Sequence, residues 1–232
     1  MEDLAAKLQE ELVAETAFTL TLPGGYEIPF AESTVISWCI IAILFALTLW
    51  LTHGMKVHNP GKKQVAVETF VKWIDGMVDS MLGEEGRGYG VYICTVLIYL
   101  ACANMSGLFG VKPPTKDMNQ TAGLAIMSIV IVQFAGIRAR GMKGWLKSFA
   151  EPIAVVLPIN ILELVIKPLS LCMRLFGNIL GAFIIMELIK IVIPVGIPIP
   201  FSFYFDIFDG CLQAYVFCFL TSIYIKEAIE TA

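Results

Sequence analysis

Charged side chains are scarce in this sequence. Only 16% of its 232 residues are Asp, Glu, Lys or Arg, whereas 57% are hydrophobic. A typical soluble domain has about a quarter charged residues, so this composition excludes an ordinary water-soluble protein and predicts an integral membrane protein. Only two histidines and no extended basic patch are present, so we expect no binding of nucleic acid.

Motifs that hold metal or phosphate are also missing. The six cysteines lie in apolar stretches and form no C-x-x-C pair, which indicates small core residues and no metal site. No G-x-x-x-x-G-K-[ST] loop is present, so we expect no cofactor and no enzymatic activity of the chain by itself. The first residues are acidic, unlike the basic start of a signal peptide, which predicts a retained N-terminal tail.

Apolar stretches near the length that crosses a bilayer as a helix, about 20 residues, recur along the chain. They lie at 35–52, 89–110, 121–137, 153–193 and 199–225. The simplest interpretation is an all-α integral membrane protein with about five crossings. The basic connections at 54–63 and 138–147 belong in the cytoplasm by the positive-inside bias, so the N-terminus is expected outside and the C-terminus in the cytoplasm.

Residues 64–83, between the first two stretches, have the pattern of an amphipathic interfacial helix. One side carries Val67, Val71, Ile74, Val78 and Leu82, and the other carries Glu68, Lys72, Asp75 and Asp79. A plain soluble connector is the alternative.

The apolar segment at 150–193 is too long for one upright crossing. As a continuous helix, its roughly 44 residues would extend about 66 Å, twice the hydrocarbon thickness. It must bend at Pro158 and Pro168 or lie strongly tilted. We therefore predict three parts: an external tail at 1–33, three membrane segments with the amphipathic helix at 34–149, and a tilted helical hairpin at 150–232.

A polar stripe runs along the long segment. Its members follow each other at intervals of three or four residues and so share one helix face: Glu163, Lys167, Ser170, Arg174 and Asn178. An Arg at mid-membrane costs roughly 2.5–3.5 kcal/mol, so Arg174 needs a partner, a water-filled cavity or a function. Lys167 is expected to snorkel or to pair with Glu163, in preference to a direct role in ion transfer.

The last apolar segment carries a second stripe, which can face the first. It consists of Ser202, Asp206, Asp209, Gln213 and Tyr224, with Gly210 allowing close approach. A buried ion pair between Arg174 and one of these carboxylates is the structural alternative to a functional site. Asp209 has an alternative explanation as a favourable charge near a helix N-terminus.

The string KPLSLCMRLFGNILGAF at 167–183, followed by LQAYVFCFLTSIYI at 212–225, resembles the signature of subunit a of F-type ATP synthases, also called subunit 6. Further strings appear in the order that this family shows. These are NPGKKQVAVE at 59–68, NMSGLFG at 104–110, PPTKDMNQT at 113–121 and LAIMS at 124–128.

The resemblance implies a membrane subunit of the Fo sector, whose tilted hairpin packs against the c-subunit ring. The expected partners are the c-ring, the b-subunit stator stalk, the rest of the F1Fo complex and the lipid bilayer. The simplest expectation for the location is a bacterial plasma (inner) membrane. The implied function is that of a stator ion channel. Two aqueous half-channels and an essential arginine, here Arg174, couple H⁺ or Na⁺ translocation to ring rotation.

The resemblance also assigns roles to the polar residues. Gln213 is expected beside Arg174, and Glu163 and Ser170 on the inner path. Candidates for the outer path are Asn178, Asp206, Asp209, Asp117 and Asn119. Many relatives have a His or Glu where this chain has Phe183, and the next acid along this chain is Glu187. Glu187 therefore either serves the outer path or pairs with Lys190.

Two other functions fit the composition. A stand-alone secondary transporter with a midplane polar site would show internal pseudo-symmetry, and the two halves show no matching hydropathy repeat. An assembly scaffold would leave the ion permeability of the membrane unchanged. The choice between H⁺ and Na⁺ is expected to depend mainly on the ring carboxylate.

Overall fold

The computed structural model describes residues 16–21, 27–56, 60–83, 86–149, 157–192 and 198–230. Within these residues, five helical segments are long and apolar enough to cross a membrane, which confirms the predicted all-α membrane protein. They are Glu32–Thr52, Arg87–Phe109, Met118–Ser148, Leu157–Met186 and Pro200–Ile229.

The chain begins, within the described residues, with an antiparallel hairpin of β1 (Thr16–Thr21) and β2 (Glu27–Ala31), which the sequence pattern did not predict. The long helices are α2 (Glu32–Thr52), α3 (Lys62–Leu82), α4 (Gly90–Met105), α5 (Met118–Ser148), α6 (Leu157–Val192) and α8 (Gly210–Glu230). Short helical turns connect them: η1 (Arg87–Tyr89), η2 (Ser106–Phe109), η3 (Pro114–Lys116), α7 (Pro198–Ser202) and the π-helix η5 (Phe203–Asp209).

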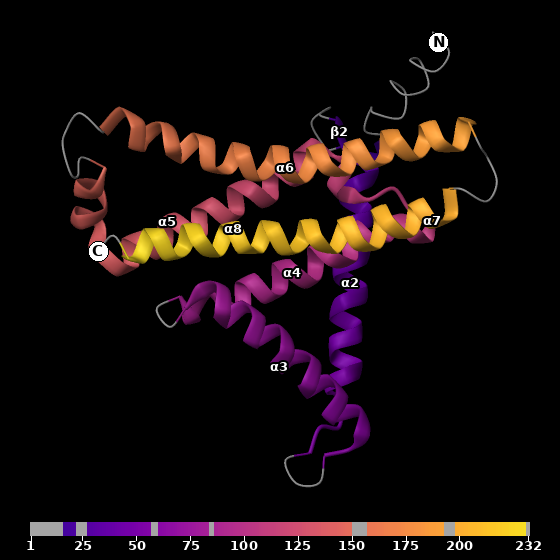
Figure 1. The fold of residues 1–232 in the computed structure, drawn as a ribbon, viewed down its shortest axis with the longest axis horizontal. Coiled ribbons are helices and arrows are strands. Elements are labelled where there is room, and N and C mark those ends of the chain that lie inside the picture. The colour runs from indigo at the N-terminus through magenta and orange to yellow at the C-terminus, as the bar shows by residue number, and fades with distance from the viewer. Residues whose placement is uncertain are drawn as a thin grey trace.

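Helices α6 and α8 lie side by side and antiparallel along the longest dimension of the molecule (Figure 1). Helix α2 stands almost across them, and α3 runs diagonally from the far end of α2 towards α4 (Figure 1). The long helix α6 continues through Pro168 without interruption, so this proline does not divide the segment. Its 36 residues extend about 54 Å, which exceeds the thickness of the hydrocarbon layer.

The basic segment 138–147, expected as a connection between crossings, is helical and belongs to α5. Gly141 interrupts the helix there with φ 70° and ψ 162°, a conformation that suits only glycine. The chain therefore changes direction through one residue and resumes as a helix.

Helix α3 has the predicted position, but only its C-terminal half packs into the bundle. Ile74, Val78, Met81 and Leu82 are buried, whereas Phe70, Val71 and Trp73 are exposed. The apolar face predicted for the whole helix is therefore covered along only part of its length.

Helix α8 is the centre of the core, because it packs against both α4 and α5. Its buried side chains include Ala214, Phe217, Cys218 and Ile225. The facing residues include Ile93, Leu97 and Leu100 of α4, and Ala125, Ile129 and Val132 of α5.

A buried amide ties the start of α8 to the rest of the bundle. Asn104 Nδ2 donates a hydrogen bond to the Gly210 carbonyl at 2.9 Å, and Thr115 Oγ1 donates to Asn104 Oδ1 at 2.8 Å. A Cβ atom at Gly210 would lie 3.0 Å from Asn104 Cβ, so glycine permits this approach. The contact fixes the position of η5, which immediately precedes α8.

Replacing Thr115 tests this tie. Thr115→Val keeps the shape but leaves Asn104 Oδ1 buried without its donor, which should lower the free energy of unfolding by about 1–3 kcal/mol. The exposed Thr95, which donates only to the Val91 carbonyl in its own helix, provides the control, and Thr95→Val should have little effect. Thermal unfolding in mild detergent measures both, and equal stability of the two variants would contradict the assignment.

Candidate functional site

Arg174 lies on the side of α6 that faces away from the bundle. Leu171, Cys172 and Leu175 are buried, and Cys172 contacts Thr121 of α5 with its Sγ 3.5 Å from Thr121 Oγ1. These residues fix the rotation of α6 and leave Arg174 exposed. An exposed Arg at the middle of an apolar helix needs water or a partner outside the chain.

Within the described residues, Arg174 makes no hydrogen bond and no ion pair. The alternative of a buried ion pair with Asp206 or Asp209 is therefore not what the structure shows. Both carboxylates lie elsewhere, in a cavity beside η5. The guanidinium is available to a group that comes from another molecule.

An amide pair joins α6 to α8 one turn after Arg174. Asn178 Nδ2 donates to Gln213 Oε1 at 2.6 Å, and Gln213 is only 1% exposed. Gln213 Nε2 is buried and has no hydrogen-bond partner in the part of the chain that the structure describes. Gln213 was expected to bond within the gap around Arg174, and its observed partner is Asn178. A buried amide whose NH2 group has no partner is uncommon, which makes Gln213 a candidate for a functional role.

The first cavity, which we call the Asp206 cavity, has a volume of about 270 Å³ and lies between η5, α6 and the segment 107–116. Asp206 and Asp209 both line it. Asp206 Oδ2 accepts a hydrogen bond from Ser202 Oγ at 2.6 Å. Gly107 packs against this carboxylate so closely that a Cβ atom would lie 2.6 Å from Asp206 Oδ1.

Phe183 and Lys116 meet in the same cavity. Lys116 Nζ lies 3.4 Å from the centre of the Phe183 ring, a cation–π contact. The expected polar group is absent at position 183, but an ammonium group approaches that place from η3. Sequence reasoning missed Lys116, because only the fold brings it to α6.

Asp117 and Asn119 do not line the Asp206 cavity. Asp117 caps α5, since its Oδ1 accepts from the Asn119 backbone N–H at 2.9 Å, and its Oδ2 accepts from Ser33 Oγ at 2.6 Å. Asn119 lines a separate, largely apolar groove between α2, α4 and α5. Glu187 belongs to α6, but its side chain is outside the described part of the structure, as is that of Lys190.

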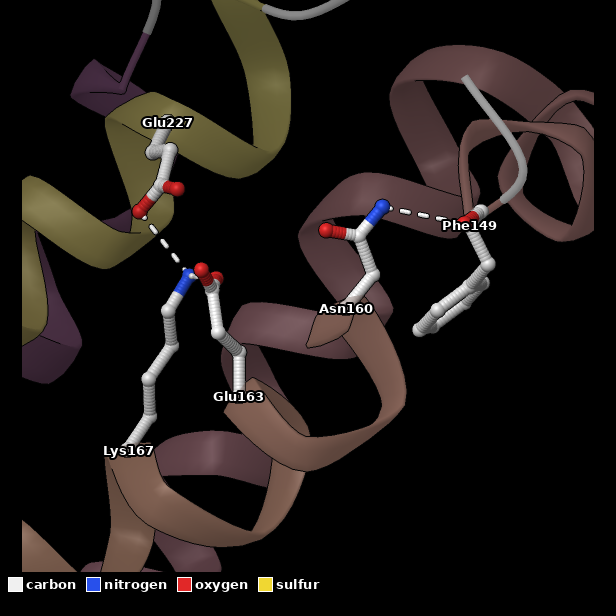
Figure 2. A network of polar contacts seen from close by, with 5 residues as sticks. All are labelled: Phe149, Asn160, Glu163, Lys167 and Glu227. Atoms are coloured by element: carbon white, nitrogen blue, oxygen red, sulfur yellow. Dashed lines mark hydrogen bonds and ion pairs between the residues drawn. The ribbon is translucent and has the colours of Figure 1, made fainter. Parts of the chain in front are cut away.

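The second cavity, the Lys167 cavity, has a volume of about 240 Å³ and lies between α5, α6 and α8. Figure 2 shows the polar network at its edge. Lys167 Nζ lies 3.0 Å from Glu227 Oε2 and 3.3 Å from Glu163 Oε2. The pairing of Lys167 with Glu163 was predicted from their spacing, whereas Glu227, 60 residues along the chain, was missed.

The two cavities open on opposite sides of Arg174 along α6. Lys167 precedes Arg174 by seven residues and Phe183 follows it by nine, about 10 Å and 14 Å of helix. Ser170 lies between Lys167 and Arg174 and is half-buried. The arrangement can bring ions towards one fixed cation from two directions without joining the two cavities.

Comparisons with known proteins agree with the sequence resemblance. Residues 34–226 match the family model described as ATP synthase A chain. ATP synthase subunit a of Moorella thermoacetica is 34% identical over 204 residues, which cover 88% of this chain and 93% of that relative. ATP synthase subunit a, sodium ion specific, of Propionigenium modestum is 30% identical over 239 residues, which cover 96% and 82%.

Gln213 and Asn104 are both buried amides, and their replacement by leucine should have opposite outcomes. Gln213→Leu removes an unpaired buried N–H, so the free energy of unfolding should change by less than about 0.5 kcal/mol. Asn104→Leu leaves the Gly210 carbonyl and the Thr115 hydroxyl without their partner, so it should lower the free energy of unfolding by about 1–3 kcal/mol. Thermal unfolding in mild detergent compares them, and strong destabilisation by Gln213→Leu would show that this amide is a structural tie.

Proposed function

Since this chain belongs to the ATP synthase A chain family, we propose that it is the stator ion-channel subunit of the Fo sector. In this role it couples ion translocation to the rotation of a c-subunit ring. The observation that carries the proposal is Arg174, a permanent cation on an apolar helix that is exposed and unpaired among the described residues. ATP chemistry belongs to other subunits of the complex.

The charge physics of Arg174 supplies the coupling. A ring carboxylate that faces lipid must be neutral, because an ionised carboxylate is expensive there. The positive charge of the Arg174 guanidinium attracts the ionised form of that carboxylate. The carboxylate therefore releases its ion as it reaches Arg174 and takes up another on the far side, while the guanidinium repels a cation that would pass directly.

The two cavities supply the approaches. The Asp206 cavity is the outer path, with Asp206 and Asp209 as its acids and the Asn178–Gln213 pair between it and Arg174. The Lys167 cavity, with Glu163 at its edge, and Ser170 form the inner path. Glu187 remains a further candidate for the outer path. Asp117 and Asn119 serve the N-terminus of α5 and the groove beside α2.

The assembly follows from the same function. The c-ring lies against the face of α6 that exposes Arg174, and the b-subunit stalk and the rest of F1Fo hold the chain still. The N-terminus lies outside and the C-terminus in the cytoplasm of a bacterial plasma membrane. Sodium specificity is stated in the name of the Propionigenium modestum relative, and the ring carboxylate decides between H⁺ and Na⁺ here.

Arg174→Ala tests the proposal in inverted membrane vesicles that contain the assembled complex. Loss of the fixed cation should lower ATP-driven ion pumping more than about tenfold, because Arg174 is the only charged residue of the sequence between Lys167 and Glu187. Arg174→Lys should not restore it fully, because a desolvated ammonium can lose its proton. Arg138→Ala, which replaces an exposed arginine of α5, is the control. Full pumping by Arg174→Ala would refute the proposal.

Gly107→Ala tests the outer path. The added methyl group would overlap Asp206 Oδ1, so the carboxylate must turn away from Ser202, and pumping should slow on the order of tenfold. Gly123→Ala is the matched control, since nothing lies within 4 Å of a Cβ atom there. Equal pumping rates in the two variants would remove Asp206 from the path.

A further inference from the structure

Two polar contacts join α6 to α8 in the described part of the chain, and they lie on either side of Arg174. Asn178 bonds Gln213 at 2.6 Å, four residues after Arg174. Lys167 bonds Glu227 at 3.0 Å, seven residues before it. At 1.5 Å per residue these contacts lie about 6 Å and 10 Å from Arg174 along the helix.

Between these contacts α8 does not hold Arg174. Its sequence from 214 to 220 is AYVFCFL, and Arg174 has no polar contact with it. The next two hydroxyl groups are buried and bond their own helix, Thr221 Oγ1 to the Phe217 carbonyl and Ser222 Oγ to the Cys218 carbonyl. The position of the guanidinium therefore depends on how α6 itself is held.

Apolar packing holds the second half of α6 more firmly than the first. Leu171, Cys172, Leu175 and Ile179 are buried, whereas no described side chain from 157 to 170 is buried and Leu164 packs against the core only in part. Polar contacts add to the attachment of the first half. Asn160 Nδ2 donates to the Phe149 carbonyl at 2.9 Å, and Lys167 reaches across to α8 (Figure 2).

Lys167 has two carboxylate partners with different geometrical roles. Glu163 is four residues away on the same helix, so this pair adds nothing to the attachment of α6. Glu227 belongs to α8, and its pair with Lys167 spans the two helices. The Lys167 side chain is 23% exposed, less than either partner, and its ammonium also lies 5.3 Å from the centre of the Tyr224 ring on α8.

We propose that Lys167 is a positioning residue for Arg174. Its bridge to Glu227 clamps the weakly packed half of α6 to α8, while the Asn178–Gln213 pair and the buried leucines hold the other half. With both sides held, Arg174 keeps one depth and one orientation against the ring. This inference rests on the proposed function of Arg174 and gives Lys167, which lines the inner path, a role in positioning Arg174.

The test uses vesicles with the whole assembled complex and measures the ratio of pumped ions to hydrolysed ATP. Lys167→Met and Glu227→Gln should each lower this ratio by about threefold, the effect expected for a partly exposed ion pair. Lys167→Arg should keep the wild-type ratio. The exchange of Lys167→Glu with Glu227→Lys should restore it, because one cation again bridges two acids.

Three results would overturn the inference. The first is a wild-type ratio in Lys167→Met. The second is a loss in Lys167→Arg as large as in Lys167→Met, which would assign a role to the ammonium itself. The third is a normal ratio in Glu227→Gln together with a reduced ratio in Glu163→Gln. Immunoblots of the assembled complex and the rate of ATP hydrolysis check that each variant assembles.

Arg174→Ala in the same vesicles distinguishes a failure of the positioning role of Lys167 from a failure of the proposed function of the chain. If Arg174→Ala stops pumping and Lys167→Met changes nothing, only the positioning role fails. If Arg174→Ala pumps at the wild-type ratio, the proposed function of the chain fails.

Discussion

The structure depends on one electrostatic constraint, the positive charge of the Arg174 guanidinium within the apolar middle of α6. No carboxylate in the described part of the structure neutralises Arg174, although Asp206, Asp209, Glu163 and Glu227 all belong to the same hairpin. Each of these four acids has a different partner or position. Asp206 accepts a hydrogen bond from Ser202, Asp209 lines the Asp206 cavity, and Glu163 and Glu227 both pair with Lys167. The uncompensated charge is therefore a property that the rest of the hairpin preserves.

Stability and function use similar side chains in different ways. Asn104 of α4 and Gln213 of α8 are both buried amides, yet Asn104 has partners for its nitrogen and its oxygen, whereas Gln213 has a partner only for its oxygen. The satisfied amide of Asn104 fixes the start of α8, whereas the half-satisfied amide of Gln213 bonds Asn178, one turn of α6 from Arg174, the charge that we propose meets another subunit. An unsatisfied buried group costs free energy, and its place next to Arg174 is consistent with a site kept for function.

The sequence was enough to predict the helical class, the crossings and the polar stripe on α6, because hydropathy and helical spacing are local properties. Lys167 and Glu163 pair as their spacing of four predicts. Contacts between distant segments were not predictable in this way, as Lys116 with Phe183 and Lys167 with Glu227 show. The continuation of α5 past Gly141 and the π-helix η5 were missed because both depend on backbone angles that no residue pattern here specifies.

The length of α6 has a mechanical consequence. A helix of about 54 Å that carries apolar residues along most of its length must lie inclined in a layer of about 30 Å. Positions along an inclined helix differ in lateral place as well as in depth, so the two cavities would open at different points around the rim of the rotor ring that we propose as the partner. The inclination would then couple depth to lateral position, because an ion that changes depth along α6 must also move sideways.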